Sequence, residues 1–150
     1  METSFNIANA NRNILLGFMN ELNFNQLTTI PSGFKNNIIW NIGHIVVVQQ
    51  LLVYHLSGLP PKISIEIIEK FKKGTLPQNI TEEDVAEIKA LLFSTIETTK
   101  IDYQNNVFVD YTPFTTMSGF TVDSAKTAIE FNNFHEGVHI GIIMQLRKFI

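Results

Sequence analysis

The sequence predicts an all-α fold, a four-helix bundle with at least one long crossover, in a single domain spanning residues 1–150. Four long segments space their apolar residues as a helix does, and no segment alternates apolar and polar residues for long, as a strand would. A long connection separates the second segment from the third, as a crossover requires. With 45% hydrophobic and 17% charged residues, the chain is apolar enough to bury a core.

The first helix is expected from Asn6 to Leu22. Apolar residues recur there at helical spacing, and with one asparagine they trace a stripe through Ile7, Asn11, Ile14, Leu15, Phe18 and Leu22. The sequence Pro31-Ser32-Gly33 then breaks the chain.

The second helix is expected over Phe34–Ser57, ending at Gly58 with two prolines just beyond. No Asp, Glu, Lys or Arg lies between Lys35 and Lys62, and this run is long enough to cross a bilayer, which needs ~20 residues. Polar side chains within the run would be costly in lipid, among them Asn41, His44, Gln49, Gln50 and His55. We therefore expect a buried helix of a bundle and no membrane association.

The same helix is apolar almost all round. Opposite the face of His44 lie further apolar residues: Ile39, Ile42, Val46 and Val53. A helix that is apolar on every side is buried on every side, whereas one bundle normally leaves a face of each helix in water. An exposed patch of this kind marks an interface, so we expect a homodimer. The first helix or the crossover could cover this face instead.

The rest of the chain predicts two more long helices. A short helical piece is expected near Ile65–Lys72. The third helix should run over Thr81–Tyr103, with Thr81 as its cap and acidic residues in its first turn, where the helix dipole favours them. A polar and aromatic loop, Asn105–Thr121, follows, and Asp123 is expected to cap the last helix, which ends near Ile150. Loops of this length are often functional.

Composition excludes several classes of function. The chain has no cysteine, so it has no disulfide, thiolate ligand or cysteine nucleophile. Its net charge is −3 and its 11 basic residues are scattered, so no basic patch predicts a nucleic-acid partner. The first residues lack the basic and apolar regions of a secretory signal, and we expect a cytoplasmic protein.

The segment His135-Glu136-Gly137-Val138-His139 is the strongest pointer to chemistry. Two histidines four apart on a helix project from one face, and both can reach one divalent ion at ~2.0–2.1 Å. The same string matches H-E-x-x-H, the signature of zinc peptidases. Both functions need a third ligand, and no later residue of the chain is suited to zinc. It must come from upstream.

The only other histidines are His44 and His55. They lie on the same face of the second helix but about 16 Å apart along its axis, at 1.5 Å per residue. They cannot both bind one ion, so only one of them can join the C-terminal pair. His55 near the helix end could instead interact with free backbone carbonyls.

Three stretches carry a resemblance to a known family. They are Trp40–His44 (WNIGH) in the second helix, Tyr111–Phe120 in the long loop, and Phe134–Gly141 (FHEGVHIG) in the last helix. Their order and spacing over nearly the whole chain resemble the DinB/YfiT superfamily, and the last stretch is the most specific. The resemblance implies an up-down-down-up four-helix bundle, often dimeric.

The resemblance also implies a site and an activity. Members bind Zn, Ni, Fe or Mn through one histidine of helix two and an His-x-x-x-His pair of helix four, which implies His44, His135 and His139 here. Members of known chemistry include transferases and isomerases that use low-molecular-weight thiols such as bacillithiol or mycothiol. Independently, three imidazoles leave a fourth ligand position open, as in catalytic zinc sites. The absence of an acidic ligand favours Zn, Ni or Fe over Ca or Mg.

Glu136 is the candidate catalytic residue. In an H-E-x-x-H peptidase it would act as the general base, but such enzymes take a third ligand after the helix and this chain offers none. Glu136 could still shuttle protons, or it could be a residue of the pocket rim or of an interface. Asn41 and Asn132 are candidates for orienting the imidazoles. Gly43, Gly137 and Gly141 are expected to allow close helix–helix approach.

The sequence thus leaves two main functions open. The first is a metal-dependent transferase that joins a small thiol to an electrophilic small molecule, with the loop Tyr111–Phe120 over the pocket bringing Tyr111 or Phe114 to the substrate. The second is a metal-binding protein without turnover, with a stress-related or scaffold role. A zinc peptidase is a remote alternative.

Overall fold

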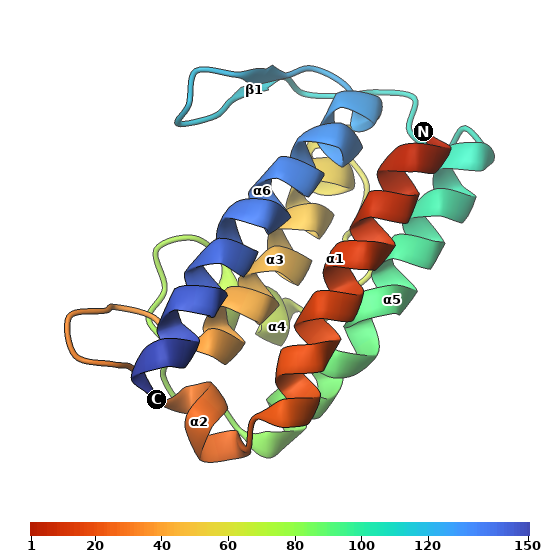
Figure 1. The fold of residues 1–150 in the computed structure, drawn as a ribbon. Coiled ribbons are helices and arrows are strands. Elements are labelled where there is room, and N and C mark those ends of the chain that lie inside the picture. The colour runs from red at the N-terminus through yellow and green to blue at the C-terminus, as the bar shows by residue number, and fades with distance from the viewer.

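The computed structural model describes residues 1–150 and confirms the all-α class (Figure 1). Four long helices dominate: α1 (Glu2–Glu21), α3 (Ile38–Val53), α5 (Glu82–Gln104) and α6 (Ala125–Leu146). The shorter elements are α2 (Phe24–Thr28), α4 (Ile65–Phe71), the 3-10 helices η1 (His55–Ser57) and η2 (Arg147–Phe149), and the strands β1 (Phe114–Thr115) and β2 (Thr121–Val122).

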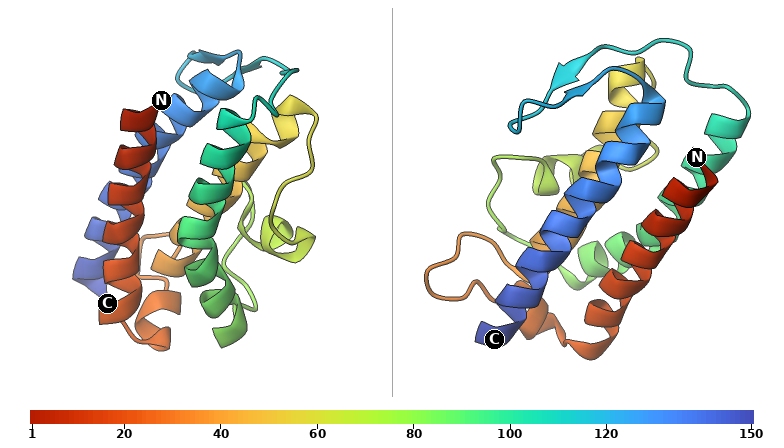
Figure 2. Two further views of the ribbon diagram at one scale, coloured as in Figure 1. Left: turned by 90° about the vertical axis from the view of Figure 1, so that its right-hand side faces the viewer. Right: turned by 45° about the horizontal axis from the view of Figure 1, so that its top comes forward.

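Each long helix packs on two others. Helix α3 contacts α6 and α5, and α1 contacts α6 and α5 as well. Helices α1 and α6 run in one direction, and α3 and α5 run in the other (Figures 1 and 2). The antiparallel hairpin β1–β2, with Phe114 opposite Val122, lies beside the start of α6 on the side away from α1 and α5 (Figure 2).

Capping side chains set where the helices begin. The side chain of Asn37 accepts the backbone N–H of Trp40, so α3 starts at Ile38 rather than at Phe34. Thr81 caps α5 as predicted, in a reciprocal pair with Asp84. Ser124, not Asp123, caps α6, and Asp123 instead accepts the hydroxyl of Thr127 at 2.9 Å. At the end of η1, Gly58 adopts a left-handed φ of 70°, which fits the predicted stop.

The buried stripe of α1 differs from the predicted one. Ile7 and Ile14 are 46% and 41% exposed, so two of the residues expected in the core face solvent. The buried positions of this helix are Phe5, Ala8, Arg12, Leu15, Phe18 and Met19. The helical period is as predicted, but the stripe is rotated because a buried arginine occupies its centre.

Helix α3 is the core helix, buried almost completely within one chain. Its apolar residues opposite His44 are fully buried: Ile39, Ile42, Val46 and Val53. The stretch Ile38–Ser57 is long and apolar enough to cross a membrane by length and composition, but 83% of it is buried inside the protein, as in a core helix. The apolar face that suggested a dimer is therefore covered within the chain, and the homodimer stays a prediction.

Gly43 allows the crossover to cover α3 closely. A Cβ atom at this position would lie 2.6 Å from the Phe71 ring of α4, so only glycine permits this approach. Gly137 and Gly141 face open space, and the prediction that they mediate close helix packing is wrong.

Candidate metal centre

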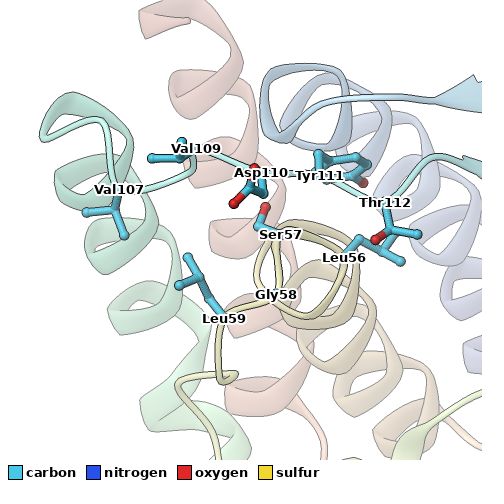
Figure 3. Close-up of a pocket in the computed structure, with 9 residues that line it drawn as sticks. All are labelled: Leu56, Ser57, Gly58, Leu59, Val107, Val109, Asp110, Tyr111 and Thr112. Carbon is cyan, nitrogen blue, oxygen red and sulfur yellow. The ribbon is translucent and has the colours of Figure 1, made fainter.

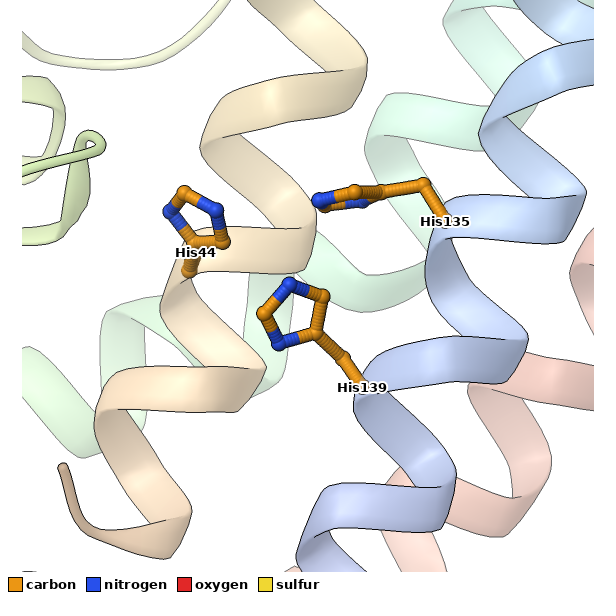
Figure 4. Close-up of side chains that lie close together, drawn as sticks. All are labelled: His44, His135 and His139. Atoms are coloured by element: carbon orange, nitrogen blue, oxygen red, sulfur yellow. The ribbon is translucent and has the colours of Figure 1, made fainter. Parts of the chain in front are cut away.

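The structure brings three histidines from two helices into one cluster. His135 and His139 project from successive turns of α6 toward α3, where their rings lie near the ring of His44 (Figure 4). Their ring centroids lie 4.5–5.4 Å apart. One potential ligand nitrogen from each ring lies within 4.8 Å of the others, so the cluster could hold a metal ion. His55 is exposed in η1, beyond the far end of α3, and takes no part.

Two hydrogen bonds fix the ring nitrogens of this cluster. The Nδ1 of His44 lies 2.7 Å from the carbonyl of Phe71, and a carbonyl can only accept, so Nδ1 carries the proton. The Nδ1 of His139 lies 2.8 Å from Oδ1 of Asn41. The amide of Asn41 is oriented by its own donation to the carbonyl of Asn37. In the neutral forms of both histidines, Nε2 is left unprotonated and available to bind a metal ion.

Burial keeps the imidazoles neutral. Burial, with smaller contributions from positive charge on His139, His44 and Arg12, lowers the pKa of His135 to about 3. Burial also lowers the pKa of His139 to about 4, with a further contribution from His44. The pKa of His44 is lowered by burial as well, although the bond to Phe71 opposes the shift. The neutral form is the one that binds metal.

Trp40 forms one wall of the cluster. Its ring stacks on His44 with centroids 4.7 Å apart and planes at 11°, and it is only 5% exposed. Its indole N–H donates to Thr75 at 3.0 Å, which joins α3 to the turn after α4.

We compared the sequence with profiles of known protein families. The sequence profile described as the DinB superfamily matches residues 8–143, a range that contains all three clustered histidines. The chain belongs to the DinB superfamily. A comparison of this DinB-like protein with curated proteins found no match.

Glu136 of the DinB-like protein lies on a different side of α6 from its histidine neighbour. Its carboxylate is fully buried between α1 and α6, where Oε1 accepts Nη2 and Nε of Arg12 at 2.7 and 3.1 Å. It also accepts the side-chain amide of Asn132 at 2.7 Å. Glu136 is thus part of an interior ion pair, not of an exposed rim. Its catalytic role stays a prediction.

The sequence did not predict that Arg12 is buried, and none of its neighbours in the chain indicates this. An isolated arginine in a helix normally faces water, and its partner lies 124 residues away. Around the pair, several buried polar atoms have no partner: Nη1 of Arg12, Oε2 of Glu136, Oδ1 of Asn132 and Nδ1 of His135. Asn41 orients a histidine as expected, whereas Asn132 bonds to Glu136.

The loop before α6 approaches the centre differently from the prediction. The hydroxyl of Tyr111 donates to the carbonyl of Leu52 at 2.9 Å, about 12 Å along α3 from His44 at 1.5 Å per residue. There Tyr111 lines a separate crevice between η1 and the loop (Figure 3). Phe114 is a half-exposed hairpin residue. The loop residue that reaches the histidine face of α6 is Phe120, which stacks on Phe131.

Proposed function

We propose that the DinB-like protein binds one divalent transition metal ion through His44, His135 and His139. The observation that carries this proposal is the pair of hydrogen bonds that commit Nδ1 of His44 and of His139 to protein acceptors. A histidine that ligates through one nitrogen donates the other N–H to a carbonyl or similar acceptor, and here the acceptors are already in place. Three neutral nitrogen ligands suit Zn, Ni or Fe.

We further infer the finer architecture that the family resemblance implies. The directions of α1, α3, α5 and α6 support an up-down-down-up four-helix bundle with α4 in the crossover (Figure 1). In that arrangement the ligands come from two adjacent helices, and the candidate site opens beside α6, where His135 and His139 are only partly buried.

We propose that the site catalyses transfer of a low-molecular-weight thiol to an electrophilic small molecule. A three-histidine set leaves a ligand position open, and a bound ion would supply Lewis acidity that lowers the pKa of a thiol. The chain's own residues bind and orient: Phe71 and Asn41 fix two imidazoles, and Trp40 excludes water from one side. No cysteine is present, so the thiol must come from a co-substrate.

The partner of Glu136 argues against the peptidase alternative. A general base must reach the reacting water, whereas the carboxylate of Glu136 is buried and bonded to Arg12 and Asn132. A metal-binding protein without turnover is the remaining alternative, and the assay below separates it from a transferase.

The test uses protein loaded separately with Zn, Ni and Fe. Each form is incubated with cysteine, glutathione, bacillithiol or mycothiol and a panel of alkyl and aryl halides, epoxides and maleimides, and thioether product is measured by mass spectrometry. We expect metal-dependent product that His135→Ala abolishes and His55→Ala retains. Stoichiometric metal without product under any combination would favour the non-catalytic role, and metal-dependent cleavage of casein would restore the peptidase.

A further inference from the structure

An aromatic wall continues the histidine row of α6. Phe131, His135 and His139 are spaced four residues apart on this helix, so their side chains lie one above another on the same face. The ring of Phe131 is stacked by Phe120 of the hairpin, with centroids 5.6 Å apart and planes at 7°. Phe120 is 49% exposed, so this wall is accessible from solvent. A flat apolar surface therefore begins one helical turn from the candidate metal ligands.

The hairpin loop is attached on both sides of the cluster. At one side Phe120 lies on Phe131 of α6. At the other, the sulfur of Met117, a residue 90% exposed, lies 3.2 Å from Nζ of Lys73. Lys73 follows Phe71, whose carbonyl holds His44, by two residues. The segment 117–120 thus connects the wall one turn from His135 with a cation two residues along the chain from Phe71, whose carbonyl holds His44.

Lys73 is exposed and has no carboxylate partner. Its only hydrogen-bond contact is the thioether of Met117, which is a weak acceptor. Its neighbours differ, because Lys72 pairs with Glu69 at 2.6 Å and Lys70 with Asp84 at 2.7 Å.

The charge of the metal-loaded site also favours an anionic ligand. Three neutral imidazoles leave the charge of a divalent ion uncompensated, and the nearby carboxylate of Glu136 is already neutralised by Arg12. With Lys73 at the margin, the site would present net positive charge beside an aromatic surface. Complementary ligands carry negative charge and a flat apolar group.

Resting on the proposed function, we propose that the site recognises an aromatic, anionic small molecule, with its ring beside Phe131 and Phe120 and its anionic group at Lys73. The same chemistry could belong to the electrophile or to the thiol. Lys73 and Phe131 would then determine specificity, without being catalytic residues.

The single tryptophan provides a direct readout that needs no turnover. Trp40 stacks on His44, so ligands entering the site should quench its fluorescence. Zinc-loaded protein is titrated with 4-nitrobenzoate and with neutral 4-nitrobenzamide to represent the electrophile. Titrations with 4-mercaptobenzoate and with thiophenol represent the thiol. We expect the anionic member of at least one pair to bind about two- to fivefold tighter, as for an exposed ion pair.

Matched variants assign the effect to residues. Lys73→Gln should abolish the preference for the anion, whereas Lys72→Gln, next to it in the chain, should retain it. Phe131→Leu should weaken both aromatic ligands of the preferred pair about two- to tenfold, and the exposed Phe149→Leu should not. The pair that shows the preference identifies whether the electrophile or the thiol carries the charge.

Failure of this inference is distinguishable from failure of the proposed function. Equal binding of both members of each pair, or a preference that survives in Lys73→Gln, would overturn the inference even if metal and thiol transfer are confirmed. Absence of bound metal in the wild type would overturn the proposed function instead. The titrations repeated on metal-free protein would then decide the inference, since Lys73 and Phe131 lie outside the ligand set.

Discussion

Removing one partner of the buried pair Arg12–Glu136 should strongly destabilise this protein. Both side chains are fully buried, and one carboxylate oxygen accepts two bonds from the guanidinium and one from Asn132. Substituting Arg12→Met preserves much of the side-chain length but leaves a buried carboxylate without its charge partner. Breaking a buried ion pair in this way costs about 3–5 kcal/mol.

Proton uptake by the carboxylate of Glu136 sets an independent upper limit on the cost of Arg12→Met. The stranded carboxylate can become neutral instead, and neutralising a glutamate of ordinary acidity at pH 7 costs about 3.7 kcal/mol. We therefore expect Arg12→Met to lower the free energy of unfolding by about 3–4 kcal/mol at pH 7, against a typical total of about 5–15 kcal/mol. The loss should shrink by up to about 2.7 kcal/mol at pH 5, because neutralisation there costs less.

Urea unfolding of the metal-free protein, followed by far-ultraviolet circular dichroism at both pH values, measures these differences. The double variant Arg12→Met/Glu136→Leu removes both charges and should recover most of the loss. The surface pair Lys72–Glu69 offers a control, since Lys72→Met should change stability by less than about 1 kcal/mol. A loss below about 1 kcal/mol for Arg12→Met, equal at both pH values, would refute the account of a desolvated ion pair.

Three further predictions concern the histidines, the crossover and assembly. Because the folded-state pKa values of His135 and His139 are about 3 and about 4, the unfolded chain binds more protons below pH 6.5. Metal-free protein should therefore lose stability as the pH falls from about 6.5 to 4. In His135→Gln, the free energy of unfolding, measured by urea titration at each pH, should depend less steeply on pH. Gly43→Ala should cost about 1–3 kcal/mol in urea unfolding because its Cβ would meet Phe71, whereas Gly137→Ala, which faces open space, should be neutral or stabilising. Light scattering at micromolar concentration should give a dimer that Phe134→Asp on the exposed side of α6 weakens, and a wild-type monomer would end the dimer prediction.

Local signals made most of the fold predictable. Thr81 and Asp84 form the capping pair that marks α5, and Gly58 ends η1 in a left-handed conformation, so both boundaries follow from nearby residues. The phase of α1 did not follow from local sequence, because Arg12 is buried only by virtue of Glu136 on a distant helix. A prediction based on the spacing of apolar residues assigns an arginine to the surface. The predicted stripe therefore lay on the side of Ile7 and Ile14.

The candidate site was predictable in its ligands and not in its surroundings. The spacing of His135 and His139 identified the pair, and the family resemblance favoured His44 over His55. The carbonyl of Phe71, which orients His44, carries no side-chain signal and depends on how the crossover packs against Gly43. The role of Phe120 depends on a short hairpin whose strands have only two residues each, too short to show alternation.

The most direct test of the account is the metal content of five purified proteins, measured by elemental analysis after saturation with Zn, Ni or Fe and removal of excess ion. We predict one ion per chain in the wild type and in His55→Ala. We predict a metal content well below one ion per chain in each of His44→Ala, His135→Ala and His139→Ala. Circular dichroism should show that each of these variants stays helical. An empty site in His55→Ala together with a full site in His44→Ala would contradict the ligand assignment on which the proposed function rests.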